Sequence, residues 1–255
     1  MRKDFYGKNW ISIWVRDKKF EKAPEFENDI ERNYYFTLPT LIHKQTVNFI
    51  NDESFIILTL MFGYFKVTNK FFELNSFSPI DTKFISDKYQ LSTFDSNVTF
   101  TSRTIQRYKQ LIKTHLGINE YNNDIESKLQ QYAIELANNF THRKKIFFSL
   151  IDYSKKLNIE IPSYTNLSKI IQKTKFWDKH RSKALNERQI KVLNKILDVG
   201  NENFEGGLNT KKYISLTKVS KATAVRDITA LVEFGCIKKI DGTAGRNTRY
   251  EINLK

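Results

Sequence analysis

The last part of the chain carries the pattern that most restricts its fold: short capped helices followed by two strands. The sequence NERQ at residues 186–189 is a capping box, in which the first and fourth side chains satisfy each other's backbone N–H groups. Apolar residues then recur at helical spacing, namely Ile190, Leu193, Ile196 and Leu197. This pattern predicts one helix, which Gly200 ends.

Two further helices are expected after it, separated by the tight turn at residues 217–220. Thr210 is the expected cap of the first, and Ser220 caps the second, which Gly235 ends. The buried stripe of the second is predicted to be Val225, Ile228, Leu231 and Val232. Two short helices joined by such a turn are typical of a helix-turn-helix.

Two strands complete this segment. Residues 236–240 and 248–254 are predicted to be strands, with a turn at Asp241-Gly242 between them. In the second strand the alternate residues Tyr250, Ile252 and Leu254 are expected to face the core. Three helices followed by a β-hairpin predict a winged helix with a small hairpin wing.

In the N-terminal part, the apolar periodicity predicts helices over residues 40–65, 102–116, 125–140 and 144–157. One further helix is predicted to begin at Ser78-Pro79, and another follows Ile161-Pro162. The fold class is therefore expected to be mainly α, with a helix-turn-helix-like unit in the N-terminal part. The apolar run at 55–65 is about half the roughly 20 residues of a membrane span, so we expect a buried helix and no membrane partner.

The aromatic residues suggest two domains. Of 35 aromatics, 29 lie in residues 1–175, and a polar stretch follows at 173–184. We therefore predict a helical domain over 1–175 and a winged helix-turn-helix domain over 176–255.

The charge points to a polyanionic partner. The chain has 42 Lys and Arg against 28 Asp and Glu, and a net charge of +14. Residues 176–255 have 16 basic and 9 acidic residues, and residues 1–175 have 26 basic and 19 acidic residues. Each part therefore has an excess of seven positive charges, and the C-terminal part is much shorter. Double-stranded DNA is the commonest partner of a basic folded domain, although a solvated Lys-rich surface would have the same composition.

The helix at 102–116 is the first candidate DNA-reading helix. Its polar residues are Arg103, Thr104, Gln106, Arg107, Lys109, Gln110 and Lys113. Arg and Gln make bidentate contacts with guanine and adenine, but the same pattern describes the solvated face of an ordinary amphipathic helix.

The second helix of the predicted helix-turn-helix is the other candidate. Its expected contact residues are Ser220, Lys221, Thr223, Ala224 and Arg226, and the wing adds Arg246, Asn247 and Arg249. The alternative is a protein-interaction module, because winged helices also dock protein partners.

Two resemblances bear on these patterns. Residues 176–255, including ALNERQIKVLNKILD, YISLTKVSKATAVRDITALVEFGCIKKI and GRNTRYEI, resemble the C-terminal winged-helix domain of the larger Fic-family proteins. The resemblance does not imply AMP transfer, because no His-Pro-Phe catalytic motif precedes the loop at 242–249.

Residues 15–174 resemble the N-terminal domain of Tn-three family replicative transposases. The matching segments are FEKAPEFENDIERNYYFTLP (20–39), FGYFKVTNKFF (62–72), TSRTIQRYKQLIKTHLGI (101–118) and IEIPSYTNLSKII (159–171). In that family this region recognises the terminal inverted repeats, so the resemblance implies DNA contact by the helix at 102–116. The chain is far shorter than such transposases and turns to a Fic-type winged helix where their catalytic part would continue.

No catalytic or metal-binding pattern is apparent, so we expect no enzyme activity, no cofactor and no metal. The histidines lie far apart in the sequence. We interpret Asp81, Asp87 and Asp95 as turn and cap residues. A single cysteine, Cys236, is typical of a protein of the reducing cytoplasm. A bacterial, nucleoid-associated location follows from the DNA-binding interpretation.

The expected function is thus a sequence-specific regulator of transcription or transposition that recognises inverted-repeat or promoter DNA through two helix-turn-helix units. A homodimer would imply a palindromic site, but no coiled-coil seam is visible.

Overall fold

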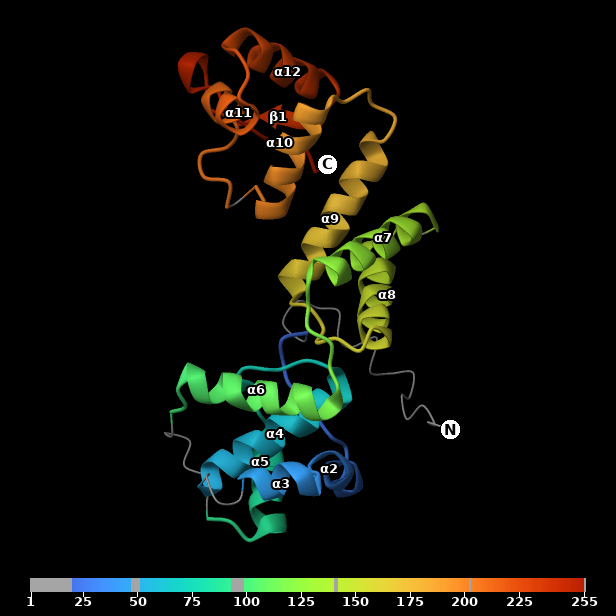
Figure 1. Ribbon diagram of the computed structural model, residues 1–255, viewed down its shortest axis with the longest axis vertical. Helices are drawn as coiled ribbons and strands as arrows, with labels where there is room; N and C mark the ends of the chain where they lie inside the picture. The colour runs from blue at the N-terminus through green and yellow to red at the C-terminus, as the bar shows by residue number, and fades with distance from the viewer. Residues whose placement is uncertain (1–19, 47–50, 93–98, 140–141, 202, 255) are drawn as a thin grey trace. The chain divides into compact units, whose positions relative to one another are not determined.

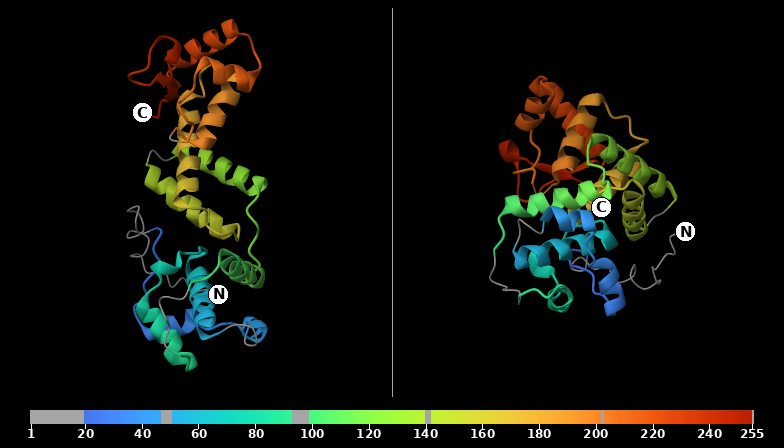
Figure 2. Two further views of the ribbon diagram at one scale, coloured as in Figure 1. Left: turned by 90° about the vertical axis from the view of Figure 1, so that its left-hand side faces the viewer. Right: turned by 60° about the horizontal axis from the view of Figure 1, so that its bottom comes forward.

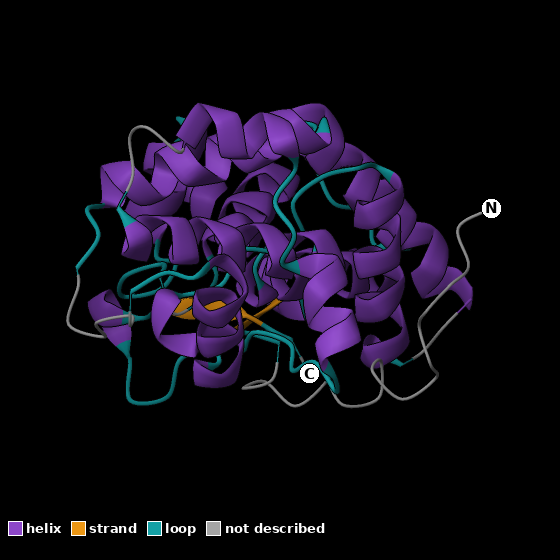
Figure 3. Cartoon of the chain, turned by 90° about the horizontal axis from the view of Figure 1, so that it is seen from below, coloured by secondary structure: helices purple, strands orange, loops and turns teal. Residues whose placement is uncertain are grey.

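The computed structural model describes residues 20–46, 51–92, 99–139, 142–201 and 203–254, and most of these residues are helical. They contain one two-stranded antiparallel sheet near the C-terminus, drawn in orange in Figure 3. The expected mainly α class is confirmed. Across these ranges, no helix is both long enough and apolar enough to cross a membrane.

The described residues form two compact units. Unit 1 holds those up to Ile125 together with Ile151–Tyr164, and unit 2 holds Glu126–Leu150 and those from Thr165 onward. The predicted boundary at residue 175 falls inside a continuous helix, α9 (Tyr164–His180). The polar stretch at 173–184 is helical as far as His180 because it is amphipathic, with Phe176 and His180 buried.

Unit 1 is built around α4 (Asp52–Thr68), in which residues 55–65 are all buried. This helix contacts α2 (Asp29–Tyr35), α5 (Pro79–Tyr89) and α6 (Ser102–Leu116), as Figure 1 shows. The short α3 (Thr40–Thr46) precedes α4, and a 3₁₀ turn, η1 (Leu74–Ser76), follows it. A helix buried all round needs neighbours on every side, which accounts for its central place.

Side-chain caps fix where these helices begin. The Asn51 side chain accepts a hydrogen bond from the backbone N–H of Ser54 at 3.0 Å, at the start of α4. At the start of α6 the cap is Thr101. The extended backbone of Thr101 sets its hydroxyl 3.1 Å from the N–H of Thr104, one of the donors that the helix itself leaves unpaired.

A buried carboxylate links three helices of unit 1. Asp81 accepts hydrogen bonds from Arg32 Nε at 2.8 Å and from Tyr64 Oη at 2.7 Å, and Arg32 also reaches Asp29 at 2.8 Å. Burial, followed by the Asp81 charge, raises the pKa of Tyr64 well above its ordinary value. The interpretation of Asp81 as a turn or cap residue was wrong, because it is a fully buried ion-pair partner.

The chain after α8 (Arg143–Lys156) holds the C-terminal end of α6. Asn158 donates from Nδ2 to the carbonyl of Gly117 at 2.8 Å, and the backbone N–H of Asn119 donates to the carbonyl of Asn158 at 2.8 Å. The N–H of Ile161 then donates to the carbonyl of Asn69 at 2.8 Å. These bonds satisfy backbone groups where α4 and α6 end.

Unit 2 contains most of α7 (Asn123–Asn139), the first part of α8, and α9 after its first residue. Three helices follow, α10 (Glu187–Val199), α11 (Thr210–Thr217) and α12 (Lys221–Glu233), drawn orange to red in Figure 2. The predicted capping box is confirmed at Asn186 and Gln189. The cap of α11 is Asn209, one residue before the expected Thr210.

The two strands of unit 2 are β1 (Ile237–Lys239) and β2 (Tyr250–Ile252), with Ile237 opposite Ile252. A short 3₁₀ turn, η2 (Gly245–Asn247), lies in the loop between them. Leu208, before α11, exchanges backbone hydrogen bonds with Tyr250 at 2.7 and 2.8 Å. Leu208 therefore pairs with β2 on the edge opposite to β1.

Candidate nucleic-acid interface

The exposed side of α6 carries the polar residues that the sequence analysis singled out. Arg103, Gln106, Arg107 and Gln110 are all exposed. Their spacing of three and four residues places them on one side of the helix, opposite the buried Tyr108 and Ile112. This helix has no Asp or Glu, so the four side chains form a cationic stripe that also offers amide groups.

Three other predicted residues of α6 have structural partners. Lys113 forms an ion pair with Glu160 at 2.6 Å, and the Lys109 ammonium lies 5.4 Å from the centre of the Phe71 ring. Thr104 bonds to the capping Thr101. The structure thus separates the predicted set into four exposed residues and three half-buried ones. Two of the exposed residues also have neighbours on the helix, since Gln110 Nε2 lies 3.4 Å from Thr114 Oγ1 and the Arg107 guanidinium lies 5.7 Å from the centre of the Tyr108 ring.

At the start of α12, Ser220 is confirmed as the cap, since its hydroxyl accepts from the N–H of Thr223 at 3.2 Å. Thr223 is half-buried and its hydroxyl also lies 3.0 Å from that of Ser220. Lys221 and Arg226 are exposed. Of the residues predicted on this helix, these two cations are the ones best placed to reach a ligand.

The predicted buried stripe of α12 is right for Ile228 and Leu231 and wrong for the other two residues. Ala224, expected to face outward, is fully buried, whereas Val225 and Val232 are 47% and 39% exposed. Asp227 is buried on the same side as Ala224, Ile228 and Leu231. Apolar spacing alone leaves the choice between the two sides open, and a carboxylate such as Asp227 is expected at the surface.

Asp227 is the centre of a hydrogen-bond network in unit 2. Its carboxylate accepts from Arg188 Nε at 2.9 Å, from Tyr213 Oη at 2.9 Å and from Asn186 Nδ2 at 3.1 Å. Burial opposes ionisation, but these hydrogen bonds outweigh it and hold the pKa of Asp227 below its ordinary value. The network joins α10, α11 and α12 and so fixes which side of α12 faces outward.

The predicted wing residues fall in and beside η2. Asn247 is exposed, and the side chain of Arg246 lies outside the described residues. Arg249 is half-buried, with its Nη1 atom 3.9 Å from where a Cβ would stand on Gly206. It therefore lies against the turn before α11 rather than projecting freely.

Sequence reasoning missed a group of exposed lysines near α12. Lys211, Lys218 and Lys239 are exposed, on α11, in the turn after it and on β1. A usable signal was present for Lys211 and Lys218, because residues 208–226 contain five Lys and Arg and no Asp or Glu. Lys238, by contrast, pairs across the sheet with Glu251 at 2.9 Å.

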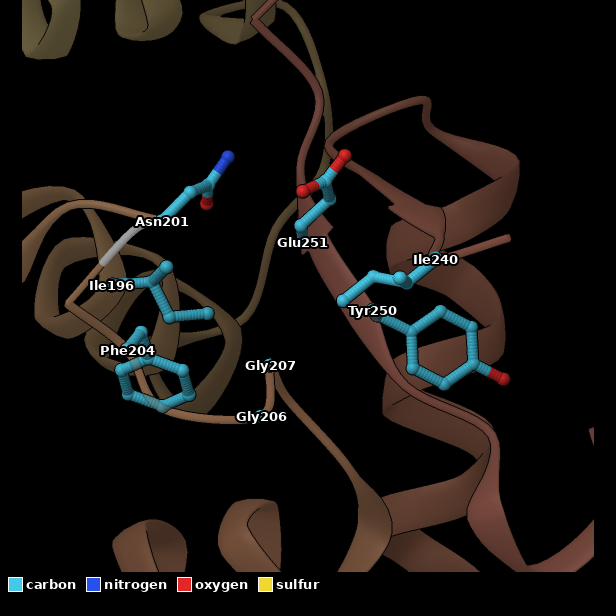
Figure 4. A pocket seen from close by; sticks show the side chains of 8 residues that line it. All are labelled: Ile196, Asn201, Phe204, Gly206, Gly207, Ile240, Tyr250 and Glu251. Carbon is cyan, nitrogen blue, oxygen red and sulfur yellow. The ribbon is translucent and has the colours of Figure 1, made fainter. Parts of the chain in front are cut away.

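A small pocket of about 180 Å³ lies beside the sheet in unit 2, as Figure 4 shows. It is lined by Ile196, Asn201, Phe204, Gly206, Gly207, Ile240, Tyr250 and Glu251. Glu251 is its one ionisable carboxylate. In the described ranges, no three His, Cys, Asp or Glu side chains are grouped so as to hold a metal ion.

Comparison with known proteins places the chain in a family. Residues 16–174 match the model of a family described as a domain of unknown function, DUF4158, and the chain belongs to that family. The match includes α6 and the whole of its exposed stripe. No curated protein matches the chain.

Proposed function

We propose that this protein is a non-catalytic, sequence-specific double-stranded DNA-binding protein that reads DNA through two helices, α6 and α12. One observation carries the proposal: each compact unit exposes a helix whose outer side presents cations, with no Asp or Glu in α6 and none from Leu208 to Arg226, the segment that leads into α12 and includes its first turns. Such a surface attracts the phosphate backbone and releases its counterions.

The C-terminal part is, on this proposal, a winged helix. The order of the elements supports this proposal, because the β1–β2 hairpin directly follows two short helices, α11 and α12, that are joined by a tight turn. The helix α10 precedes them, and Leu208, between α10 and α11, pairs with β2. In a winged helix the second helix of the motif enters the major groove with its N-terminal residues toward the bases. Lys221 and Arg226 would then face DNA, and Asn247 would approach the backbone.

The N-terminal unit would act through the α6 stripe. Arg103 and Arg107 alternate with Gln106 and Gln110, and these are the side chains that bind guanine and adenine edges bidentately. The resemblance of residues 15–174 to the end-recognising domain of Tn-three transposases supports the same assignment.

The most economical role is regulation. A protein that occupies inverted repeats or a promoter without cutting them would repress transposition or transcription, either as a monomer or as a homodimer on a palindromic site. Such a protein would be located in the bacterial cytoplasm, bound to the nucleoid.

Fluorescence anisotropy tests the proposal. The full chain is titrated with duplexes from its own upstream DNA and flanking repeats, and with random duplex, across a salt series. We expect at least a thousandfold preference for one native duplex, at the low end of the typical specific range, with a steep salt slope. Equal, weak binding to every duplex would contradict it.

A second candidate is a protein-docking module. The exposure of Val225 and Val232 favours it, because apolar side chains on an exposed helix can also meet a protein partner. This candidate predicts weak DNA binding of low salt dependence.

A further inference from the structure

The outer side of α12 carries aliphatic and methyl-bearing side chains in a regular row. Ala222, Val225, Thr229 and Val232 are all exposed, at successive intervals of three, four and three residues. This spacing places them along one side of the helix. They differ from the α6 stripe, whose exposed side chains are Arg and Gln.

Thr229 belongs to this row through its methyl group. Its hydroxyl donates to the carbonyl of Val225 at 2.9 Å, which occupies its donor within the helix. The hydroxyl oxygen can still accept a hydrogen bond, and the methyl is the apolar group that Thr229 offers for an outside contact. The row presents methyl groups over three turns of the helix.

The charges around the row indicate its partner. Lys218 and Lys221 precede it, Arg226 lies within it, and all three are exposed. Of the two acids of α12, Asp227 is buried and paired with Arg188, and Glu233 is exposed at the C-terminal end of the row. Three exposed cations against one exposed acid leave the row edged mainly by positive charge, which is complementary to base edges flanked by phosphates.

We infer that α12 reads thymine, by packing its methyl row against the C5-methyl groups in the major groove. This rests on the proposed DNA-binding function and specifies its chemistry. The thymine methyl is the one apolar group that a base pair presents in that groove, and Ala and Thr methyls are its usual contacts. Arg226 would bind guanine or phosphate beside it, while α6 reads hydrogen-bonding groups.

The test uses duplexes selected from a random library by the full chain. Each thymine of the selected site is replaced in turn by deoxyuridine, which removes the methyl and keeps every hydrogen-bonding group. We expect at least one position where deoxyuridine weakens binding about fourfold, the value for one buried methyl-sized group. At that position Val225→Ala should bind the thymine duplex more weakly and show no further loss with deoxyuridine.

Ile190→Ala is the matched control, because Ile190 is a partly exposed aliphatic residue of the same unit that lies on α10. It should bind as the unsubstituted chain does and keep the deoxyuridine effect. A selected site without a deoxyuridine effect, or an equal effect in Val225→Ala, would overturn the inference and leave the proposed function standing. Selection that enriches no site would instead defeat the proposed function.

Light scattering completes the test. The mass of the free protein should be the same before and after Val225→Ala. Conversion of a dimer to a monomer by this substitution would show that the row is a contact between copies of the chain, which would also overturn the inference.

Discussion

At the scale of single residues, each unit contains one buried carboxylate held by an arginine and a tyrosine. Asp81 is bound by Arg32 and Tyr64, and Asp227 by Arg188 and Tyr213. Buried charges are tolerated only when paired and hydrogen-bonded, so each group constrains the helices that supply it. In unit 2 the constraint also sets the outward side of the proposed reading helix.

Asp227→Asn should destabilise unit 2 by about 1–3 kcal/mol, because the amide has one acceptor oxygen in place of two and cannot accept all the hydrogen bonds that Arg188, Tyr213 and Asn186 donate to the carboxylate. Tyr213→Phe, which removes a single hydrogen bond, should cost about 1 kcal/mol. Urea unfolding followed by circular dichroism measures both. If Asp227→Asn unfolds at the same urea concentration as the unsubstituted chain, the network does not hold the helices together.

His180 should make stability fall on mild acidification. It is 2% exposed, and neither ring nitrogen has a hydrogen-bond partner within the described part of the chain. Burial, then the charges of Lys179 and Lys183, lowers its pKa. On acidification the unfolded chain therefore binds a proton at His180 before the folded chain does. The free energy of unfolding is not reduced by this protonation above about pH 6.5, and it falls below that pH.

His180→Leu should reduce that decline by no more than about 1.4 kcal/mol per pH unit. The free energy of unfolding at pH 7.5 and 5.5 gives the comparison. Equal losses in both proteins would mean that His180 takes up its proton in the folded state as readily as in the unfolded chain.

At the scale of elements, the helix positions were largely predictable and the orientation of α12 was not. Local signals such as Ser78-Pro79, the capping box at 186–189 and Gly117 locate helix ends, because they act within a few residues. The side that a helix buries depends on partners distant in sequence. Asp227 is buried through Arg188, which lies on α10, so hydropathy alone assigned Val225 to the core.

The candidate site was predictable to a similar degree. The exposed stripe of α6 follows from its 3.6-residue period, and its four exposed members were all identified. The engagement of Lys113 by Glu160 depends on the return of the chain after α8. No local pattern carries that information.

Packing of α4 against the segment after α2 should depend on Gly63. A Cβ at this position would lie 2.3 Å from Cδ1 of the Phe36 ring. Gly63→Ala should therefore destabilise unit 1 by about 1–3 kcal/mol through overpacking. Thermal unfolding measures the effect, and an unchanged midpoint would show that Phe36 moves aside without cost.

Two cations of α6 should respond differently to substitution. Arg107→Ala should weaken binding to the preferred duplex at least about fivefold, as expected for loss of a bidentate contact. Lys113→Ala should change affinity by less than about twofold and lose only an ion pair worth at most about 1 kcal/mol of stability. Anisotropy titrations compare them, and equal losses would show that α6 does not contact DNA through its exposed stripe.

At the scale of the whole molecule, two reading helices in one chain would raise affinity by effective concentration. Once one helix is bound, the other searches a small volume, so two modest affinities combine into a tight one. The two helices would also recognise different groups on the bases, since α6 offers hydrogen-bonding groups and α12 offers methyl groups.

Hydroxyl-radical footprinting of the preferred duplex shows whether the two helices read DNA independently. The unsubstituted chain should protect two separate segments, of which Arg107→Ala loses one and Arg226→Ala loses the other. A single protected segment that both substitutions weaken alike would contradict reading by two independent helices, and no protection at all would contradict DNA recognition itself.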